Sequence, residues 1–486
     1  MSDRGPEAEG RAPPDGGSIP RVDIHRPDFA EALKAAVDEF GVAVVKGAAT
    51  AAELAAGEEL AWRFMERDAA PTGIKRDVPG THTDKAFHSL GFARSGVVTE
   101  FSVGQSDFLW FSRTLPGVRK IFRSLWGVER DCDLVTSFDG CGIARNPFVS
   151  PADAALGAKA RRPLPRMPAE EFAAEVARVE AEAAEAMGDF APAAAAGAAG
   201  GAGGEAAVVS AGRSKKAQKA RKRAKALEEK KKRQAEAAAA AAAVTTATPE
   251  ADMSEDAGDD EAGPESPTSA DAPPADEGGD RDTRDWQLRK SYLTHGRWFH
   301  LDQNGHEKPR FDLWQGLLNY FPATGATGST VVVVGSHRDA FTRVFRSPHR
   351  KKSRGAFVML NRPGDYEEFC ADAVQVTLDA GDFMLWDSRV VHCNQGVDPR
   401  DTPEAGAASL ALPGRETHPL ARLVAYVSMA PRDRLTDKQS AMRRAMVEAG
   451  MTGTHQPIVT ALKSRESATS KRYACPPATS PIWGLV

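Results

Sequence analysis

The chain contains few cysteines, and they lie far apart. Its 486 residues include 5 of them, with no CxxC pair and no cysteine and histidine cluster of the zinc-finger type. A structural zinc site needs such a cluster, so this spacing excludes a zinc-finger module. An odd number of scattered thiols favours a reducing compartment.

Long apolar runs and an excess of one charge are also lacking. No stretch approaches the length that spans a membrane, and the first residues, MSDRGPEAEGRAPPDGG, lack the apolar core of a signal peptide. Lys and Arg total 63 against 67 Asp and Glu, and the net charge of -4 gives no reason to expect a protein that mainly binds nucleic acid or a membrane surface. We therefore predict a cytoplasmic protein with no membrane partner and a short disordered tail over residues 1–17.

A low-complexity insertion is expected over residues 148–284, and it contains two opposite charge blocks. Residues 213–233 hold 12 Lys or Arg and 2 Glu, a net of 12 - 2 = +10, whereas residues 250–280 hold 12 Asp or Glu and no base. Ala, Gly and Pro dominate the remainder, which leaves few apolar side chains to offset the entropy lost on ordering. The insertion should therefore be mobile, with one or two transient or solvent-exposed helices, one of them at 172–187.

The basic block at 213–233 allows several interpretations. It could act as a nuclear localisation signal, make a weak nucleic-acid contact or pair with the acidic stretch. A solvated low-complexity run with no dedicated role is the simplest interpretation. Outside this block, nothing in the sequence favours a nucleic-acid partner.

The sequence on either side of the insertion has the pattern of a folded domain. Before it, Asp28 can cap a helix, a strand-like GVAVVKG follows, and a second helix runs through Leu54, Leu60, Trp62 and Phe64. After it come short strand-like segments bounded by Gly, Pro and Asp: RWFHLD, QGLLNYF, TVVVVGSH, AFVMLN, AVQVTLDAGDFMLWDS and ARLVAYVSMA.

Such a string of short strands favours a barrel or sandwich over a βαβ sheet. We predict one mainly β domain with flanking helices, formed by residues 18–147 and 285–470 and interrupted by the insertion. A C-terminal tail is expected at 471–486.

Three residues from two of these segments could bind a metal ion. In RWFHLD, His300 and Asp302 lie two apart, so an extended chain points both side chains to the same side. His392 ends a hydrophobic strand in DFMLWDSRVVHCNQG, 392 - 300 = 92 residues later. Two imidazoles and one carboxylate cap one face of an octahedral ion and leave three positions open, enough for a chelating 2-oxoacid and dioxygen. The simpler alternative for His300 and Asp302 is a hydrogen-bonded pair at a strand end.

An arginine on a later strand could bind the far carboxylate of the 2-oxoacid. In ARLVAYVSMA, Arg422, Val424, Tyr426 and Ser428 share one face of an alternating strand. An arginine that points into a barrel needs an anionic partner, because burial of an unpaired charge is costly. The alternative is an edge strand with Arg422 in solvent.

Further polar and aromatic residues are candidates for the same pocket. Amide and hydroxyl groups of Gln315, Asn319 and Thr330 could bond the 2-oxoacid, although sheet packing explains them nearly as well. Trp298 and Trp386 could wall the pocket, as could Tyr426 and Ser428. His337, in VGSH, is expected to support the fold or a metal ligand, because the ligand set is already complete.

These segments together resemble the phytanoyl-CoA dioxygenase-like family of Fe(II)- and 2-oxoglutarate-dependent oxygenases. The resemblance is carried by GRWFHLDQ, WQGLLNYFPATGATGSTVVVVGSHRD, AGDFMLWDSRVVHCNQG and RLVAYVSMAPR. It implies a double-stranded β-helix, a jelly-roll barrel of the cupin-like kind, with iron on His300, Asp302 and His392 and 2-oxoglutarate on Arg422. The implied reaction hydroxylates a small molecule with O2, releases succinate and CO2, and has ascorbate as a candidate reductant.

Two other functions stay open at the level of sequence. The same barrel could be a non-catalytic binding or scaffold protein that uses the charged insertion for its contacts. A zinc-dependent hydrolase would also show three ligands, with a water in the fourth position, but it has no use for an inward Arg422. The sequence does not specify the substrate, a CoA thioester included, or the oligomeric state.

Overall fold

The structure, a computed structural model, describes most of the chain outside the central insertion. The described residues are 19–92, 95–149, 166–188, 287–288, 292, 296, 298–325, 327–346, 357–397, 418–458, 473 and 476–486. The tail expected at 1–17 and both charge blocks, at 213–233 and 250–280, lie outside them.

Helices lie mainly in the first half of the described chain. The α-helices are α1 (Phe29–Phe40), α2 (Ala51–Arg63), α3 (Asp84–His88), α4 (Asp107–Thr114), α5 (Pro116–Trp126), α7 (Ala169–Met187), α9 (Asp339–Arg346), α10 (Asp365–Phe369) and α12 (Asp437–Glu448). A π-helical turn, η2 (Phe64–Asp68), extends α2, and short 3-10 turns occur at η3 (Ala70–Thr72), η4 (Pro79–Thr81), η5 (Val103–Gln105), η6 (Asp131–Asp133), η10 (Arg432–Arg434) and η11 (Pro481–Leu485).

The first helix shows how the sequence pattern determines an element. α1 begins after Asp28, as predicted, and buries Phe29, Leu33, Ala36 and Val37 on one face. The Asp28 side chain does not cap the helix, however, and accepts a hydrogen bond from Arg26 Nε at 2.6 Å instead. It ends at Gly41, whose φ of 74° lies in the left-handed region that glycine adopts without strain. A Cβ at this glycine would also lie 2.4 Å from the His337 imidazole, so the turn into the next strand requires glycine.

Strands from both flanks of the insertion combine in one large sheet. Its order is β1 (Arg21–Asp23), β2 (Val42–Lys46), β14 (Phe383–Asp387), β10 (Trp314–Asn319), β16 (Leu420–Pro431), β6 (Cys141–Arg145), β4 (Val97–Val98) and β3 (Gly91–Phe92), with β5 (Leu134–Thr136) also paired to β16. Strands from both sides of the insertion therefore contribute to the same sheet.

A smaller sheet carries two of the three residues expected to bind metal. Its order is β12 (Val358–Met359), β9 (His300–Leu301), β15 (His392–Gln395), β11 (Ser329–Val332) and β13 (Val374–Gln375). A third pair, β7 (Phe148–Val149) with β8 (Gln287–Leu288), joins the two ends of the predicted insertion. The ladders between the described strands form two separate larger sheets, with one isolated bridge between Ala323 and Leu378, and they do not show a closed barrel.

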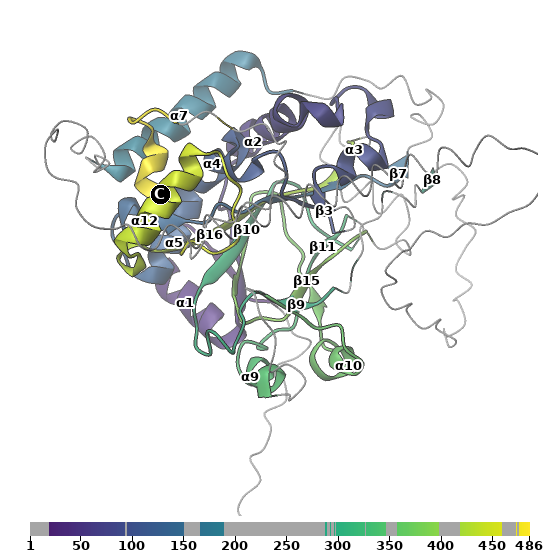
Figure 1. The fold of residues 1–486 in the computed structure, drawn as a ribbon, viewed down its shortest axis with the longest axis vertical. Coiled ribbons are helices and arrows are strands. Elements are labelled where there is room, and N and C mark those ends of the chain that lie inside the picture. The colour runs from purple at the N-terminus through teal and green to yellow at the C-terminus, as the bar shows by residue number, and fades with distance from the viewer. Residues whose placement is uncertain are drawn as a thin grey trace, which may run out of the picture. The chain divides into compact units, whose positions relative to one another are not determined.

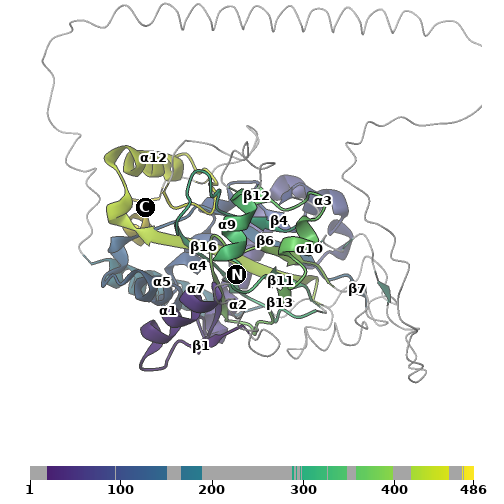
Figure 2. The same cartoon turned by 90° about the horizontal axis from the view of Figure 1, so that it is seen from below.

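The sheets and helices are arranged in layers (Figures 1 and 2). One face of the large sheet packs against helices α1, α2, α4, α5 and α7 in the main core, through alternate residues such as Leu423 and Ala425 of β16. The opposite face packs toward the small sheet, where Val424 contacts a cluster that includes Val332 of β11. Helices α9 and α10 cover the far side of the small sheet. The space between the two sheets holds the site described below.

Helix α7 differs from the prediction of a mobile insertion. It lies inside the range 148–284, and the helical spacing was predicted, but its face is packed rather than exposed: Val179, Ala183 and Met187 are buried. On its other side Arg178 forms an ion pair with Glu53 of α2, with a 2.7 Å distance between Nη2 and Oε1. The prediction missed the packing of α7 because a thin apolar stripe is enough to dock a helix when the neighbouring core already offers a matching surface.

The C-terminal segment also differs from the expected tail at 471–486. Residues Ile482, Trp483 and Leu485 of η11 are buried in the main core, and Gly484 lies against Met187 of α7. η11 is a short 3-10 turn, so the burial of these apolar residues was not visible as a period in the sequence. In the described part of the chain, no helix has the length and apolarity needed to cross a membrane.

Candidate metal centre

The two histidines face each other across neighbouring strands. His300 of β9 and His392 of β15 are paired in the antiparallel register, and their ring centroids are 4.3 Å apart. Side chains of directly opposed residues lie on the same face of a sheet, so this pairing brings together two residues that are 92 positions apart in the sequence. The register of this one strand pair therefore places two of the three candidate ligands.

Backbone hydrogen bonds orient both imidazoles. His300 Nδ1–H donates to the carbonyl of Trp298 at 3.2 Å, and His392 Nδ1–H donates to the carbonyl of Val390 at 3.0 Å. In each ring this leaves Nε2 with its lone pair, which is the atom a metal ion would bind. The Trp298 ring stacks on the His300 imidazole with 4.6 Å between the ring centroids, and this contact further fixes the orientation of the imidazole plane.

Asp302 completes the cluster from the turn after β9. Its Oδ1 lies 3.5 Å from His300 Nε2, and its Oδ2 lies 3.3 Å from His392 Nε2. The three ligand atoms lie within 4.8 Å of one another. All three side chains are mostly buried, with 9%, 14% and 7% of the surface of His300, Asp302 and His392 exposed.

Two further side chains hold Asp302. Gln315 Nε2 donates to Asp302 Oδ2 at 3.1 Å, and His455 Nε2–H donates to the Asp302 backbone carbonyl at 3.1 Å. His455 was not predicted, because it comes from an irregular segment after α12 that has no periodic pattern. Its Nδ1 is 3.9 Å from Asp302 Oδ1.

The electrostatic environment keeps the cluster ready to bind a cation. Burial and the neighbouring His392 lower the pKa of His300 to about 4, so this ring is neutral near pH 7. Burial raises the pKa of Asp302, but the imidazoles of His455, His300 and His392 together hold it well below its usual range. Neutral imidazoles beside an ionised carboxylate are the protonation states that a metal ion requires.

Arg422 lies nearby on the large sheet and is buried. Its Nη2 donates to Thr330 Oγ1 of the small sheet at 3.0 Å, and its Nε has no hydrogen-bond partner within the described part of the chain. Burial lowers the pKa of Arg422. No described carboxylate lies within ion-pair distance of this guanidinium, so it is a buried cation that lacks a protein anion.

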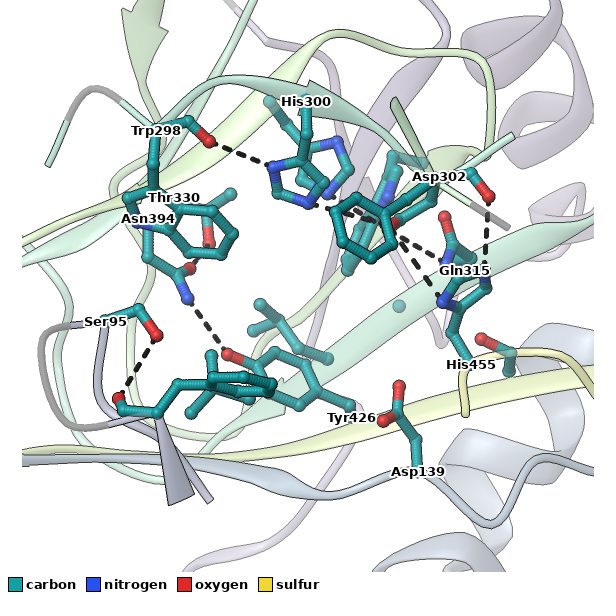
Figure 3. Close-up of a pocket in the computed structure, with 18 of the residues that line it drawn as sticks. Ser95, Asp139, Trp298, His300, Asp302, Gln315, Thr330, Asn394, Tyr426 and His455 are labelled. Atoms are coloured by element: carbon teal, nitrogen blue, oxygen red, sulfur yellow. Dashed lines mark hydrogen bonds and ion pairs between the residues drawn. The ribbon is translucent and has the colours of Figure 1, made fainter. Parts of the chain in front are cut away.

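A short polar network connects Arg422 to the cavity wall. Thr330 Oγ1 donates to Asn394 Oδ1 at 3.4 Å, and Asn394 Nδ2 donates to the Tyr426 hydroxyl at 3.0 Å (Figure 3). Asn394 was missed at the level of sequence, although it lies two residues after His392 on the same strand and its side chain therefore points to the same face. That two-residue period was the signal that could have found it.

A cavity of about 320 Å³ contains the cluster and opens between the two sheets. Its lining includes most of the predicted residues: His300, Asp302, His392, Gln315, Thr330, Trp298, Trp386, Tyr426 and Ser428. It also includes residues that were not predicted, among them Asp139, Asn394, His455, Phe92 and Phe357. Buried polar atoms of Gln315, Trp298 and Trp386 have no hydrogen-bond partner among the described residues.

Three predicted residues do not line this cavity. Asn319 was expected to bond the 2-oxoacid, but its Nδ2 donates instead to the carbonyls of Phe321 and Asp379, because a turn between strands passes over the end of β10. His337 bonds the Asp38 carbonyl at 3.3 Å beside α1, which fits the expected role in supporting the fold. Arg422 lies directly behind Thr330, one hydrogen bond from the cavity surface.

Comparison with known proteins gives only distant structural likenesses. No family model matches the chain, and neither does any curated protein. The chain is similar to the epimerase SnoN in complex with Fe3+, alpha ketoglutarate and nogalamycin RO, with 16% identity, 27% of this chain and 41% of that chain covered, and a TM-score of 0.18. It is similar to EctD from S. alaskensis with bound Fe, with 14% identity, 30% and 42% covered, and a TM-score of 0.19.

A third likeness extends over more of the chain. A hypothetical protein from Escherichia coli, JW0805, is 11% identical, with 91% of this chain and 79% of that chain covered and a TM-score of 0.37. The chain spans less than half the length of SnoN and EctD.

Proposed function

We propose that the chain is an Fe(II)- and 2-oxoglutarate-dependent dioxygenase, similar to the phytanoyl-CoA dioxygenase-like family, that hydroxylates a small molecule. The observation that carries the proposal is the combination of two sites in one cavity region. One is a cluster of two imidazoles and a carboxylate within 4.8 Å, in which burial lowers the pKa of His300, and the other is the buried Arg422 without a described protein anion.

The residues fit the iron in number, type and protonation. His300, Asp302 and His392 would hold it through Nε2, a carboxylate oxygen and Nε2, because both Nδ1 atoms are already bonded to backbone carbonyls. With 2-oxoglutarate and O2, the bound iron would supply the oxidising power that converts a C–H bond to C–OH, while 2-oxoglutarate leaves as succinate and CO2. The remaining task of the protein is to bind and orient.

The residues also fit 2-oxoglutarate. Arg422 would bind the distal carboxylate, and the hydroxyl of Thr330, which already accepts from Arg422, would lie beside it. The buried Gln315 Oε1, which has no partner among the described residues, requires a donor or an ordered water near the metal. Gln315 Nε2 fixes Asp302 against rotation.

The test is anaerobic addition of Fe(II) and 2-oxoglutarate to metal-free protein. The expected result is a visible absorbance band at one equivalent of iron, because the chelate is coloured whereas zinc is spectroscopically silent. Asp302→Ala should abolish the band, and succinate formation in air should fall at least 100-fold. Asp372→Ala, which changes an exposed aspartate away from the cavity, is the matched control.

The same experiment separates the two alternatives. A zinc-dependent hydrolase would retain stoichiometric zinc and give no band with Fe(II) and 2-oxoglutarate. A non-catalytic scaffold would bind neither iron nor 2-oxoglutarate. Succinate formation that persisted in Asp302→Ala would refute the proposed function.

A further inference from the structure

Two exposed aromatic rings line the cavity at its mouth. Phe92 of β3 and Phe357, directly before β12, are 55% and 45% exposed, and both belong to the cavity lining. They are two of the four large hydrophobic side chains that are this exposed in the described part of the chain. β3 is the last strand of the large sheet and β12 is an outer strand of the small one, so the rings come from separate parts of the fold. Exposed apolar side chains that gather at one cavity indicate a binding site.

Aromatic rings continue from the mouth to the metal cluster. The Phe357 ring lies edge-on to the His300 imidazole, with 6.2 Å between the ring centroids. Trp298 stacks on the same imidazole, and the Trp386 ring lies 5.2 Å from that of His392. A C–H bond that is oxidised at the proposed metal must lie close to the two histidines, and therefore near these rings. The reacting end of the substrate is thus expected to be apolar.

Most of the other polar groups in the lining are bonded to one another. Thr330, Asn394 and Tyr426 form a hydrogen-bonded chain that begins at Arg422, and its part inside the cavity is drawn in Figure 3. Under the proposed function this chain serves 2-oxoglutarate. Gln315 is bonded to Asp302 of the metal cluster. The aromatic part of the lining therefore remains for the substrate.

The lining offers no permanent positive charge to an anionic substrate. Among the described residues that form the cavity wall there is no lysine or arginine, and Arg422 would bind 2-oxoglutarate. A substrate carboxylate or phosphate inside the cavity would therefore be buried without a cation to offset its charge. This argues against a free acid as the substrate.

A cationic substrate is no better matched to the lining. Its two carboxylates, those of Asp302 and Asp139, are both engaged within the protein. Asp302 belongs to the metal cluster and accepts from Gln315, and Asp139 Oδ1 accepts from Gly140 N–H at 2.8 Å. An ammonium group would add a buried charge without a carboxylate of its own. The cavity is therefore matched to an uncharged molecule.

We propose that the substrate is a small uncharged molecule with an apolar ring, which packs against Phe92 and Phe357 and presents a C–H bond to the metal cluster. Flat rings pack well on aromatic side chains, in offset or edge-to-face pairs. This inference rests on the proposed function and specifies its substrate class. The cavity of about 320 Å³ is at the low end of small-molecule sites, which span roughly 300–1,000 Å³, and 2-oxoglutarate takes part of it, so the substrate is small.

The first arm of the test compares three probes that share one body and differ in the head group: 4-phenylbutanol, 4-phenylbutylamine and 4-phenylbutanoate. Each is titrated into the full chain loaded with Mn(II) and 2-oxoglutarate, a form that binds without turning over, and affinity is measured by calorimetry. The alcohol should bind roughly tenfold more tightly than either charged probe, because each charge would be buried without a partner.

The second arm removes one ring at a time. Phe92→Ala and Phe357→Ala should each weaken 4-phenylbutanol roughly fivefold, because its phenyl ring loses one of its two aromatic contacts at the mouth. The 2-oxoglutarate Kd should stay within about twofold in both variants, since both rings are exposed and surface substitutions seldom disturb a fold. Tyr366→Ala, which removes a 41% exposed ring outside the cavity, is the matched control and should change neither Kd.

The outcomes separate this inference from the function on which it rests. If wild-type protein gives no visible band with Fe(II) and 2-oxoglutarate, the proposed function fails. If the band forms but the alcohol binds no more tightly than the charged probes, or no probe binds, the substrate inference is overturned. It is also overturned if either phenylalanine variant binds the alcohol as tightly as wild type, because the ring is then held elsewhere. An equal loss of 2-oxoglutarate affinity would assign these rings to the metal site instead of the substrate.

Discussion

At the residue scale, short-range alternation predicted three side chains that the structure places close together. The two-residue spacing of His300 and Asp302 and the strand end at His392 are local features, and the structure brings all three together. Asp139 and His455 could not be predicted in this way, because they come from irregular turns where no period relates a side chain to a face. Asn319 lies on the same strand face as Gln315, as predicted, but it does not line the cavity. A shared strand face does not determine how far along the strand a cavity extends.

Arg422 gives the clearest test at this scale. In Arg422→Met the buried methylene chain is mostly kept and the charge is lost, so the 2-oxoglutarate Kd should rise roughly 10- to 100-fold, the effect of losing a charge-assisted hydrogen bond worth about 1.5–3 kcal/mol. Titration of 2-oxoglutarate into Mn(II)-loaded protein measures it.

Two accompanying measurements separate anchoring from a structural role. Mn(II) affinity should stay within threefold in Arg422→Met, because the metal ligands are untouched, and Thr330→Val should give a smaller loss of 2-oxoglutarate affinity than Arg422→Met. An unchanged 2-oxoglutarate Kd in Arg422→Met would assign Arg422 to packing alone.

At the scale of elements, the sequence predicted which segments are helices and strands, but not which surfaces they cover. The buried face of α1 carries four apolar side chains at helical spacing, which is a local feature of the sequence. Helix α7 has the same spacing with mostly alanine, and its burial depends on a partner surface formed by α2, α4 and η11, which lie far away in the sequence. Local pattern carries no information about such a partner.

The packing of α7 predicts a sharp contrast between two alanines two residues apart. Ala183→Asp places a carboxylate at a buried position and should destabilise the fold by about 3 kcal/mol or more, because burial of an unpaired charge is costly. Ala181→Asp adds the same group on the exposed side of the same helix and should change stability by less than about 0.5 kcal/mol. Urea unfolding of both variants measures the difference, and equal stabilities would mean that α7 is not packed in solution.

At the scale of the whole molecule, the sequence predicted a mainly β fold with helices but not its layer order. Whether strands form a barrel or two facing sheets depends on pairings between distant segments, and β9, β12 and β13 have only two residues each in their ladders. The hydrogen bond between His337 and the Asp38 carbonyl illustrates how layers are joined, since it connects the turn before α9 with the end of α1.

Acid should weaken this connection between layers. Burial lowers the pKa of His337 below its ordinary value of 6.5, so the unfolded chain binds a proton more readily than the folded chain. The contribution of this residue to stability is therefore fully present above pH 6.5 and is lost as the pH falls from 6.5 toward the lower folded-state value.

The measurement is the free energy of unfolding between pH 7 and pH 5, with a chelator present so that metal binding does not contribute. His337→Gln should lose less stability than wild type over this range, whereas His88→Gln, at an exposed histidine, should follow the wild-type profile. Parallel pH profiles for wild type and His337→Gln would contradict a pH-dependent contribution of His337 to stability.

The position of β16 has a consequence for biosynthesis. This strand lies at the centre of the large sheet, between β10 and β6, yet it spans residues 420–431 near the end of the chain. On the ribosome, β2 has only β1 as a neighbour, and β6 has only β4, until β14, β10 and β16 emerge, so the nascent chain carries open sheet edges until then. Tyr426 and Ser428 of β16 line the same cavity as His300, Asp302 and His392, so this cavity can be complete only after the late strand has been made.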